Sequence, residues 1–65
     1  MTIQVYKLND NNYLLVKYGT NPNKFLQDGQ SIERPPHNTD SIQKRFTDIV
    51  EREGYYMGPL PGPDK

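Results

Sequence analysis

The fold is decided by the stretch TIQVYKL-NDNN-YLLVKY, residues 2–18. Two runs rich in β-branched and aromatic residues flank a cluster of turn formers, and this pattern predicts a β-hairpin. With residues 9–12 as a four-residue loop, the expected register places Val5 opposite Val16. Both faces of the hairpin then carry apolar side chains, whereas a sheet with one face in water should alternate apolar and polar residues.

A second hairpin is expected further along the chain. Residues 24–27 and 30–33 are short strand-like runs separated by Asp28-Gly29. Asp-Gly suits a two-residue type I′ turn, which needs a positive φ at both central positions. Two consecutive prolines follow at positions 35 and 36, and they stop the sheet because proline donates no backbone hydrogen bond.

Residues 40–53 are predicted to form the helix. Asp40 is the expected N-cap, with Gln43 as its capping-box partner, and Gly54 is the expected stop. Four apolar residues recur at helical spacing and form one stripe that can pack on a sheet. The stripe consists of Ile42, Phe46, Ile49 and Val50. A short final strand is expected after it, within residues 55–60.

Together these elements predict an α+β fold. We expect a small antiparallel sheet of four to five short strands, in the order ββββαβ, with one helix packed on one face. Residues 1–58 are predicted to form one domain, because 65 residues are too few for a second. The rest of the chain, residues 59–65, is rich in Pro and Gly and is expected to be an extended or disordered tail.

Composition excludes several classes of protein. The chain has no Cys and one His, which argues against disulfides and against a metal site. Its formal net charge is zero, which argues against recruitment of a partner by bulk electrostatics. No apolar run is long enough for a membrane span, and no signal peptide is recognisable. A cytoplasmic location and no membrane partner are therefore expected.

The sequence holds no convincing catalytic set. His37, Asp40 and Ser41 have the residue types of a hydrolytic triad, but Asp40 and Ser41 are better explained as capping residues. Asp48 and Glu51 are helix neighbours with basic residues interleaved, which is typical of a solvated helix face. We predict that the protein is not an enzyme, and we assign no catalytic, cofactor-binding or metal-binding residue.

The predicted hairpin has one face that the helix leaves uncovered. In the expected register Tyr6 faces Leu15 and Leu8 faces Tyr13 on that face, with Lys17 at its rim. Exposed apolar patches of this kind mark contact surfaces, and Tyr is enriched at interfaces. We therefore predict a protein-interaction module (a regulator, inhibitor or accessory subunit) that binds a protein partner or a second copy of itself. Its small size also fits a protein encoded by a phage or mobile element.

Two alternatives stay open at this point. The same tyrosines on a sheet, with Lys7 and Lys17 nearby, are compatible with single-stranded nucleic-acid binding by base stacking. This is the weaker hypothesis, because only three basic residues fall in the first 27 positions. The other alternative is that the sheet curls toward a barrel, so that the second apolar face is core and not a surface.

Overall fold

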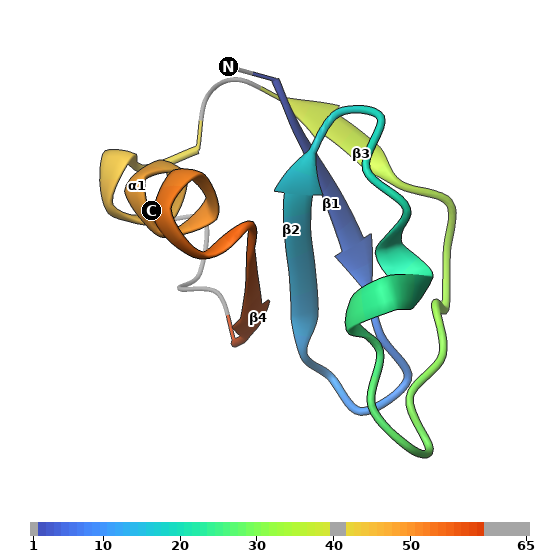
Figure 1. Ribbon diagram of the computed structural model, residues 1–65. Coiled ribbons are helices and arrows are strands. Elements are labelled where there is room, and N and C mark those ends of the chain that lie inside the picture. The colour runs from blue at the N-terminus through green and yellow to red at the C-terminus, as the bar shows by residue number, and fades with distance from the viewer. Residues whose placement is uncertain (1, 40–41, 60–65) are drawn as a thin grey trace.

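The computed structural model describes residues 2–39 and 42–59 (Figure 1). These residues form a four-stranded antiparallel sheet of order β3-β1-β2-β4 with one helix packed against it, which confirms the predicted α+β class. The strands are β1 (Ile3–Lys7), β2 (Tyr13–Lys17), β3 (His37–Thr39) and β4 (Tyr55–Gly58). The helices are η1 (Pro22–Phe25), a short 3-10 helix, and α1 (Lys44–Glu53). Apart from Pro59, the predicted tail lies outside the described residues.

The first hairpin is present, but its loop is shorter than predicted. The backbone N–H of Leu8 donates to the carbonyl of Asn12 at 2.9 Å, so three residues and not four close the turn. Asn11 adopts a left-handed conformation with φ of 69°, which Asn tolerates better than most residues. The Asp10 carboxylate accepts from the backbone N–H of Asn12 at 3.2 Å and fixes the turn.

The shorter loop makes the predicted register wrong by one residue. Val5 pairs with Leu15 instead of Val16, and Tyr6 pairs with Leu14. Because side chains alternate between the two faces of a strand, a slip of one residue moves every β2 side chain to the other face relative to β1. The two faces of the sheet therefore have a different composition from the one predicted.

The helix covers one face of the sheet. Phe46 and Val50 of α1 are buried there, and the Phe46 ring meets the Tyr56 ring edge to face at a centroid distance of 4.9 Å. The strands contribute Ile3 and Leu15, both without exposed surface. Partly buried side chains pack around this cluster: Val5, Tyr13, Ile42 and Tyr56.

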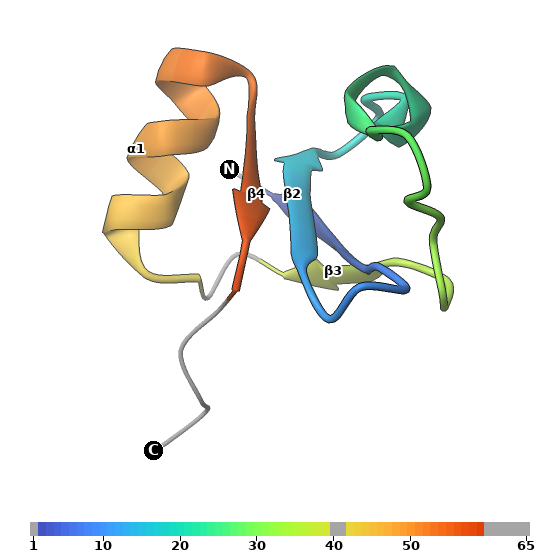
Figure 2. The same cartoon turned by 90° about the horizontal axis from the view of Figure 1, so that it is seen from below.

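The opposite face is covered by the segment between β2 and β3. Figure 2 shows this segment, with η1, on the side of the sheet opposite α1. It contributes Phe25, whose ring stacks on Tyr55 at a centroid distance of 4.5 Å. This second cluster consists of buried Tyr6, Leu8, Leu14 and Val16, with Phe25, Leu26, Ile32, Tyr55 and Met57 packed around it. Both faces are therefore core.

The predicted strands of the second hairpin, residues 24–27 and 30–33, do not pair with each other in the structure. The turn at Asp28-Gly29 exists, since the N–H of Gln30 donates to the carbonyl of Gln27 at 3.0 Å. Its flanks form the 3-10 helix and one isolated bridge from Ile32 to Leu8 instead of two paired strands. Phe25 and Ile32 are needed on the second sheet face, and packing there outweighs the local strand preference.

Polar contacts fix the tip of this segment against the first hairpin. The Asn9 side chain donates to the Gly29 carbonyl and accepts from the Ser31 N–H, both at 2.9 Å. The Gln30 side chain donates to the Asp10 carboxylate at 2.8 Å, and this hydrogen bond is the main reason that the pKa of Asp10 is lowered. Two loops far apart in sequence are thereby held together.

The helix is shorter at its start than predicted. It begins at Lys44 with Gln43 as N-cap, and the Gln43 side chain makes no capping bond. The predicted helix start is therefore wrong, and Asp40 and Ser41, the predicted capping residues, lie outside the described residues. The predicted end is confirmed: Gly54 caps the helix at φ of 93°, and its N–H donates to the Val50 carbonyl.

Candidate interaction site

The predicted contact residues do not form one surface. Tyr6 and Leu8 point to the face covered by the η1 segment, whereas Tyr13 and Leu15 point to the helix face. Tyr6, Leu8 and Leu15 are buried, Tyr13 is half-buried and Lys17 is exposed. Tyr6, Leu8 and Leu15 are therefore covered by other parts of the fold, whereas Tyr13 and Lys17 keep accessible surface.

Strand β4 is one of the two edges of the sheet. In the β1–β2 ladder the even-numbered residues of β2 direct their backbone groups to β1, as the bond from the Tyr18 N–H to the Thr2 carbonyl indicates. The odd-numbered residues of β2 therefore face β4, where Tyr13 pairs with Gly58 and Leu15 with Tyr56.

The same alternation determines which backbone N–H and C=O groups of β4 are not paired with β2. If Tyr56 and Gly58 direct their N–H and C=O groups to β2, then Tyr55 and Met57 direct theirs away from the sheet. Within the described residues no further strand lies beyond β4. This edge therefore presents two donors and two acceptors in strand geometry.

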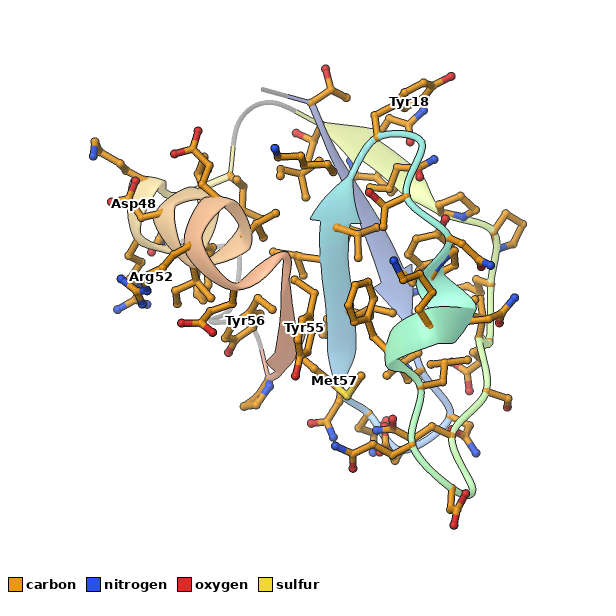
Figure 3. All side chains as sticks on the ribbon, viewed as in Figure 1. Tyr18, Asp48, Arg52, Tyr55, Tyr56 and Met57 are labelled. Carbon is orange, nitrogen blue, oxygen red and sulfur yellow. The ribbon has the colours of Figure 1, made fainter. Side chains whose placement is uncertain are left out.

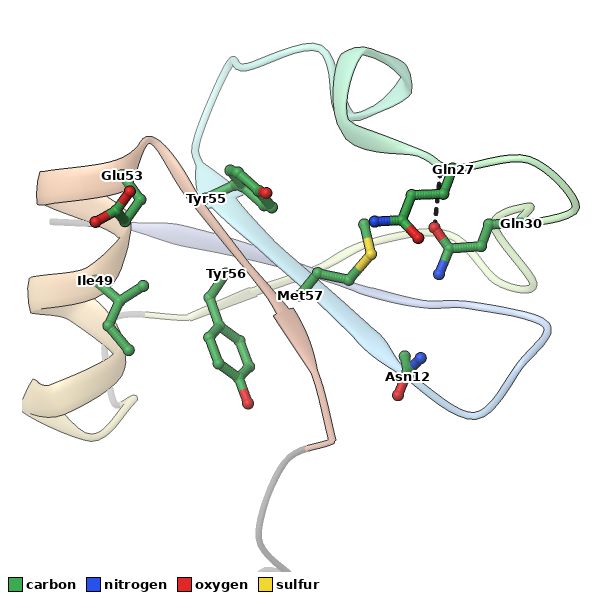
Figure 4. Close-up of a pocket in the computed structure, with 8 residues that line it drawn as sticks. All are labelled: Asn12, Gln27, Gln30, Ile49, Glu53, Tyr55, Tyr56 and Met57. Carbon is green, nitrogen blue, oxygen red and sulfur yellow. Dashed lines mark hydrogen bonds between the residues drawn. The ribbon is translucent and has the colours of Figure 1, made fainter.

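A hollow of about 410 Å³ follows this edge. Figure 4 shows β4 crossing its middle, with Ile49 and Tyr56 on the helix side and Tyr55 and Met57 on the other. The hollow is lined by Asn12, Gln27, Gln30, Ile49, Glu53, Tyr55, Tyr56 and Met57. The backbone edge is thus flanked on both sides by half-buried apolar side chains with a polar rim.

The aromatic side chains of the edge are held in place. Tyr55 and Tyr56 project to opposite sides of β4 (Figure 3). Phe25 stacks on Tyr55, and the Tyr56 hydroxyl donates to the Pro59 carbonyl at 2.8 Å. Rigid aromatic groups lose little conformational entropy when a partner covers them, which favours binding at this edge.

A second hollow, of about 430 Å³, lies over the hairpin end of the helix face. It is lined by Val5, Lys7, Tyr13, Arg34, Pro35 and His37. The Lys7 side chain donates a hydrogen bond to the Glu33 carboxylate at 2.9 Å. This hydrogen bond is the main cause of the lowered pKa of Glu33, and the positive charge of Lys7 is the second cause. The hollow therefore places the half-buried ring of Tyr13 near the basic side chains of Lys7, Arg34 and His37.

The described residues offer no arrangement for metal binding or for a hydrolytic triad. They contain no group of three or more metal-ligating side chains. His37 lies in the exposed strand β3, and the structure does not describe the two residues proposed beside it as a triad. On α1, Asp48 pairs with Lys44 at 3.2 Å and points away from the sheet (Figure 3). None of the described helices is both long and apolar enough to cross a membrane.

The β4 edge was not among the predicted contact residues. Its signals in the sequence are Tyr55-Tyr56-Met57, three large side chains in a row, and the Gly58-Pro59 pair that ends the strand at an edge. The sequence could not reveal that this strand is outermost, because strand order depends on pairing between distant segments.

The comparisons with known proteins add no family. No protein-family model matches the chain, and no significant match was found among curated proteins or solved structures.

Proposed function

We propose that the protein is a small non-enzymatic protein-interaction module, and that it binds an extended segment of a protein partner along β4. The observation that carries this proposal is the outward direction of the backbone groups of Tyr55 and Met57. In strand addition, main-chain hydrogen bonds supply affinity and flanking hollows receive alternate side chains. The hollow on both sides of β4 suits that mode of binding.

The other edge of the sheet is a weaker candidate. Strand β3 has three residues, His37, Asn38 and Thr39, and its side chains are polar and largely exposed. Two prolines precede it directly, which is a common way of blocking an edge against pairing. The side chains of β4 itself are large and apolar or aromatic, whereas those of β3 are polar, and for that reason we place the interaction at β4.

The test is photo-cross-linking from the edge in extracts of the source cells. A photoreactive phenylalanine analogue replaces Glu53, beside the edge, or Glu51, which lies two positions away on the opposite side of α1. We expect position 53 to cross-link to a discrete protein and position 51 to give no such product. Equal labelling from both positions, or none from either, would refute a role for the edge.

A backbone variant sharpens this test. Met57→Pro removes one outward N–H, and proline is tolerated at such edge positions. Met57→Leu keeps the N–H and most of the apolar volume and is the matched control. We expect cross-linking from position 53 to be lost in the proline variant and kept in the leucine variant, with similar circular dichroism spectra for both.

A second candidate function is single-stranded nucleic-acid binding in the hollow that contains Tyr13. The observation that favours it is the grouping of this ring with Lys7, Arg34 and His37. A fluorescently labelled mixed-sequence oligonucleotide should bind at low salt and dissociate steeply as salt rises. Arg34→Glu should weaken this binding more than Lys44→Glu, which makes the same charge change on α1. Equal effects of the two substitutions would exclude the hollow as the binding site.

A further inference from the structure

We infer that the hollow lined by Tyr13 and Arg34 holds one nucleoside phosphate, with the base against the Tyr13 ring and the phosphate at Arg34 and His37. This inference rests on the second candidate function, because it names the unit of ligand that the same hollow receives. That unit is either a free nucleotide or one residue of a single strand, since both carry a planar base and a phosphate. The place of the hollow, the arrangement of its side chains and its charge support the inference.

The hollow lies on a part of the sheet that α1 leaves partly uncovered. Figures 1 and 2 place α1 beside β4, whereas β3 forms the opposite edge of the sheet. Val5 and Tyr13 lie on the helix face, and both keep accessible surface. The volume of about 430 Å³ is within the range of about 300–1,000 Å³ that is usual for small-molecule sites. The space is therefore large enough for a single nucleotide.

The strand ladders set the side chains of the hollow in two rows. Tyr13 of β2 lies directly opposite Lys7 of β1. In the next row, Val5 of β1 lies directly opposite His37 of β3. Residues directly opposite each other in antiparallel strands project to the same face, which here is the helix face. The two rows thus place one aromatic ring, one aliphatic side chain and two basic side chains on one surface.

The ring and the imidazole lie at opposite ends of this surface. Neighbouring strands are about 4.8 Å apart, and the two rows are two residues, or about 6.7 Å, apart. Because β1 separates β2 from β3, the Cα atoms of Tyr13 and His37 are then roughly 12 Å apart. This separation suits an elongated ligand that carries its base at one end and its phosphate at the other.

The charge of the hollow suits a phosphate. Lys7 is paired with Glu33 at 2.9 Å, and the two charges compensate each other. Within residues 2–39 and 42–59, the side chains of Arg34 and His37 make no hydrogen bond and no ion pair, and both residues are exposed. A guanidinium binds phosphate oxygens through two parallel hydrogen bonds, and an imidazole can donate one more. The hollow therefore offers one uncompensated cation and one additional donor to an anionic group.

A nucleoside phosphate fits this hollow better than an acidic protein segment does. An acidic segment is typically held by a cluster of arginines, whereas the hollow has one arginine, and its lysine is already paired. Stacking of a base on an aromatic ring adds an attraction that a carboxylate side chain does not make. Tyr13 packs against the cluster under α1, so its ring loses little conformational entropy when a base covers it.

The experiment is an NMR titration of the full-length, isotope-labelled chain. The probes are adenosine 5′-monophosphate, adenosine and inorganic phosphate, each added to millimolar concentration. We expect the monophosphate to shift the amide signals of Val5, Tyr13 and His37 in a saturable way. Adenosine lacks the anion and phosphate lacks the base, so each should bind at least about fivefold more weakly than the monophosphate.

Variants with matched controls assign the two ends of the ligand. Tyr13→Leu removes the ring and should weaken binding of the monophosphate about fivefold or more, whereas Tyr13→Phe keeps the ring and should bind like the wild type. Arg34→Gln should weaken binding by a similar factor, and Arg52→Gln, the same change on α1, should have no effect. If circular dichroism shows that Tyr13→Leu does not fold, the two arginine variants decide the outcome.

Several results would overturn the inference. Adenosine or phosphate that binds as tightly as the monophosphate would show that the ring and the cation do not act together. Equal effects of Arg34→Gln and Arg52→Gln would place the site elsewhere. Displacement of the monophosphate by an equal concentration of a short glutamate peptide would show that the hollow selects charge alone.

A labelled oligonucleotide separates this inference from the second candidate function. An oligonucleotide that binds through Arg34 while the monophosphate does not bind would overturn the inference and leave that function standing. Binding of the monophosphate without binding of the oligonucleotide would refute strand binding and assign the hollow to free nucleotides. If neither probe binds, both proposals fail.

Discussion

Replacing Leu8 with alanine tests whether the second face of the sheet is true core. Leu8 has no exposed surface and lies among Tyr6, Leu14 and Val16. Truncating a buried leucine to alanine costs about 2–5 kcal/mol, from lost burial and from the cavity left behind. Globular domains are stable by roughly 0.05–0.15 kcal/mol per residue, which gives about 3–10 kcal/mol for 65 residues. The substitution should therefore remove a large share of the free energy of unfolding.

The assay is urea unfolding followed by far-ultraviolet circular dichroism. With a slope of about 1 kcal/mol per molar urea, typical of a small domain, a loss of 2 kcal/mol lowers the midpoint by about 2 M. Tyr18→Ala is the control, because Tyr18 is 65% exposed and its loss should change stability by at most about 0.5 kcal/mol. A Leu8→Ala midpoint as close to wild type as that of Tyr18→Ala would show that the η1 segment does not cover this face.

Three further predictions concern single features of the fold. Gly54→Ala should lower the free energy of unfolding by about 1 kcal/mol, because φ of 93° strains a residue with a Cβ; chemical denaturation measures this. The pKa of Glu33 is lowered mainly by the hydrogen bond from Lys7, so the ionised carboxylate stabilises the fold above its ordinary pKa of 4.5. This contribution is lost as the pH falls through the lowered pKa. Glu33→Gln should therefore reduce the dependence of the free energy of unfolding on pH in the acid range, as measured by urea unfolding at several pH values. Phe25→Leu and Tyr55→Leu should show a coupling of about 0.5–1.5 kcal/mol in a double-mutant cycle, because their rings stack; additive effects would contradict the stacking.

The first hairpin and the amphipathic helix could be predicted because their signals are local. Strand propensity around a turn cluster located β1 and β2, and the apolar stripe with its terminal Gly54 located α1. The register could not be predicted from the same residues. It depends on whether Asn11 adopts a left-handed conformation, which shortens the loop by one residue and exchanges the faces of β2.

The errors in the middle of the chain have a different cause. Asp28-Gly29 does form a turn, but its flanks are recruited as a cover for the second sheet face, and Asn9 and Gln30 hold that cover in place through contacts between distant loops. Such contacts leave no periodic trace in the sequence. The candidate site was missed for a related reason: whether β4 is an inner or outer strand is a property of the whole sheet.

The two segments that pack on the faces of the sheet, α1 and the segment that contains η1, differ in regular structure and therefore in local stability. The α1 cover is a continuous helix, whereas the η1 cover is an irregular segment that contacts the sheet through Phe25, Leu26 and Ile32. Irregular segments with few apolar contacts are the first to open in native-state fluctuations. Opening of this segment would expose Leu8, Leu14 and Val16 of the hairpin to solvent, and exposed apolar strand residues promote aggregation. Substitutions that loosen residues 19–36 should therefore reduce the yield of soluble protein before they lower the melting temperature.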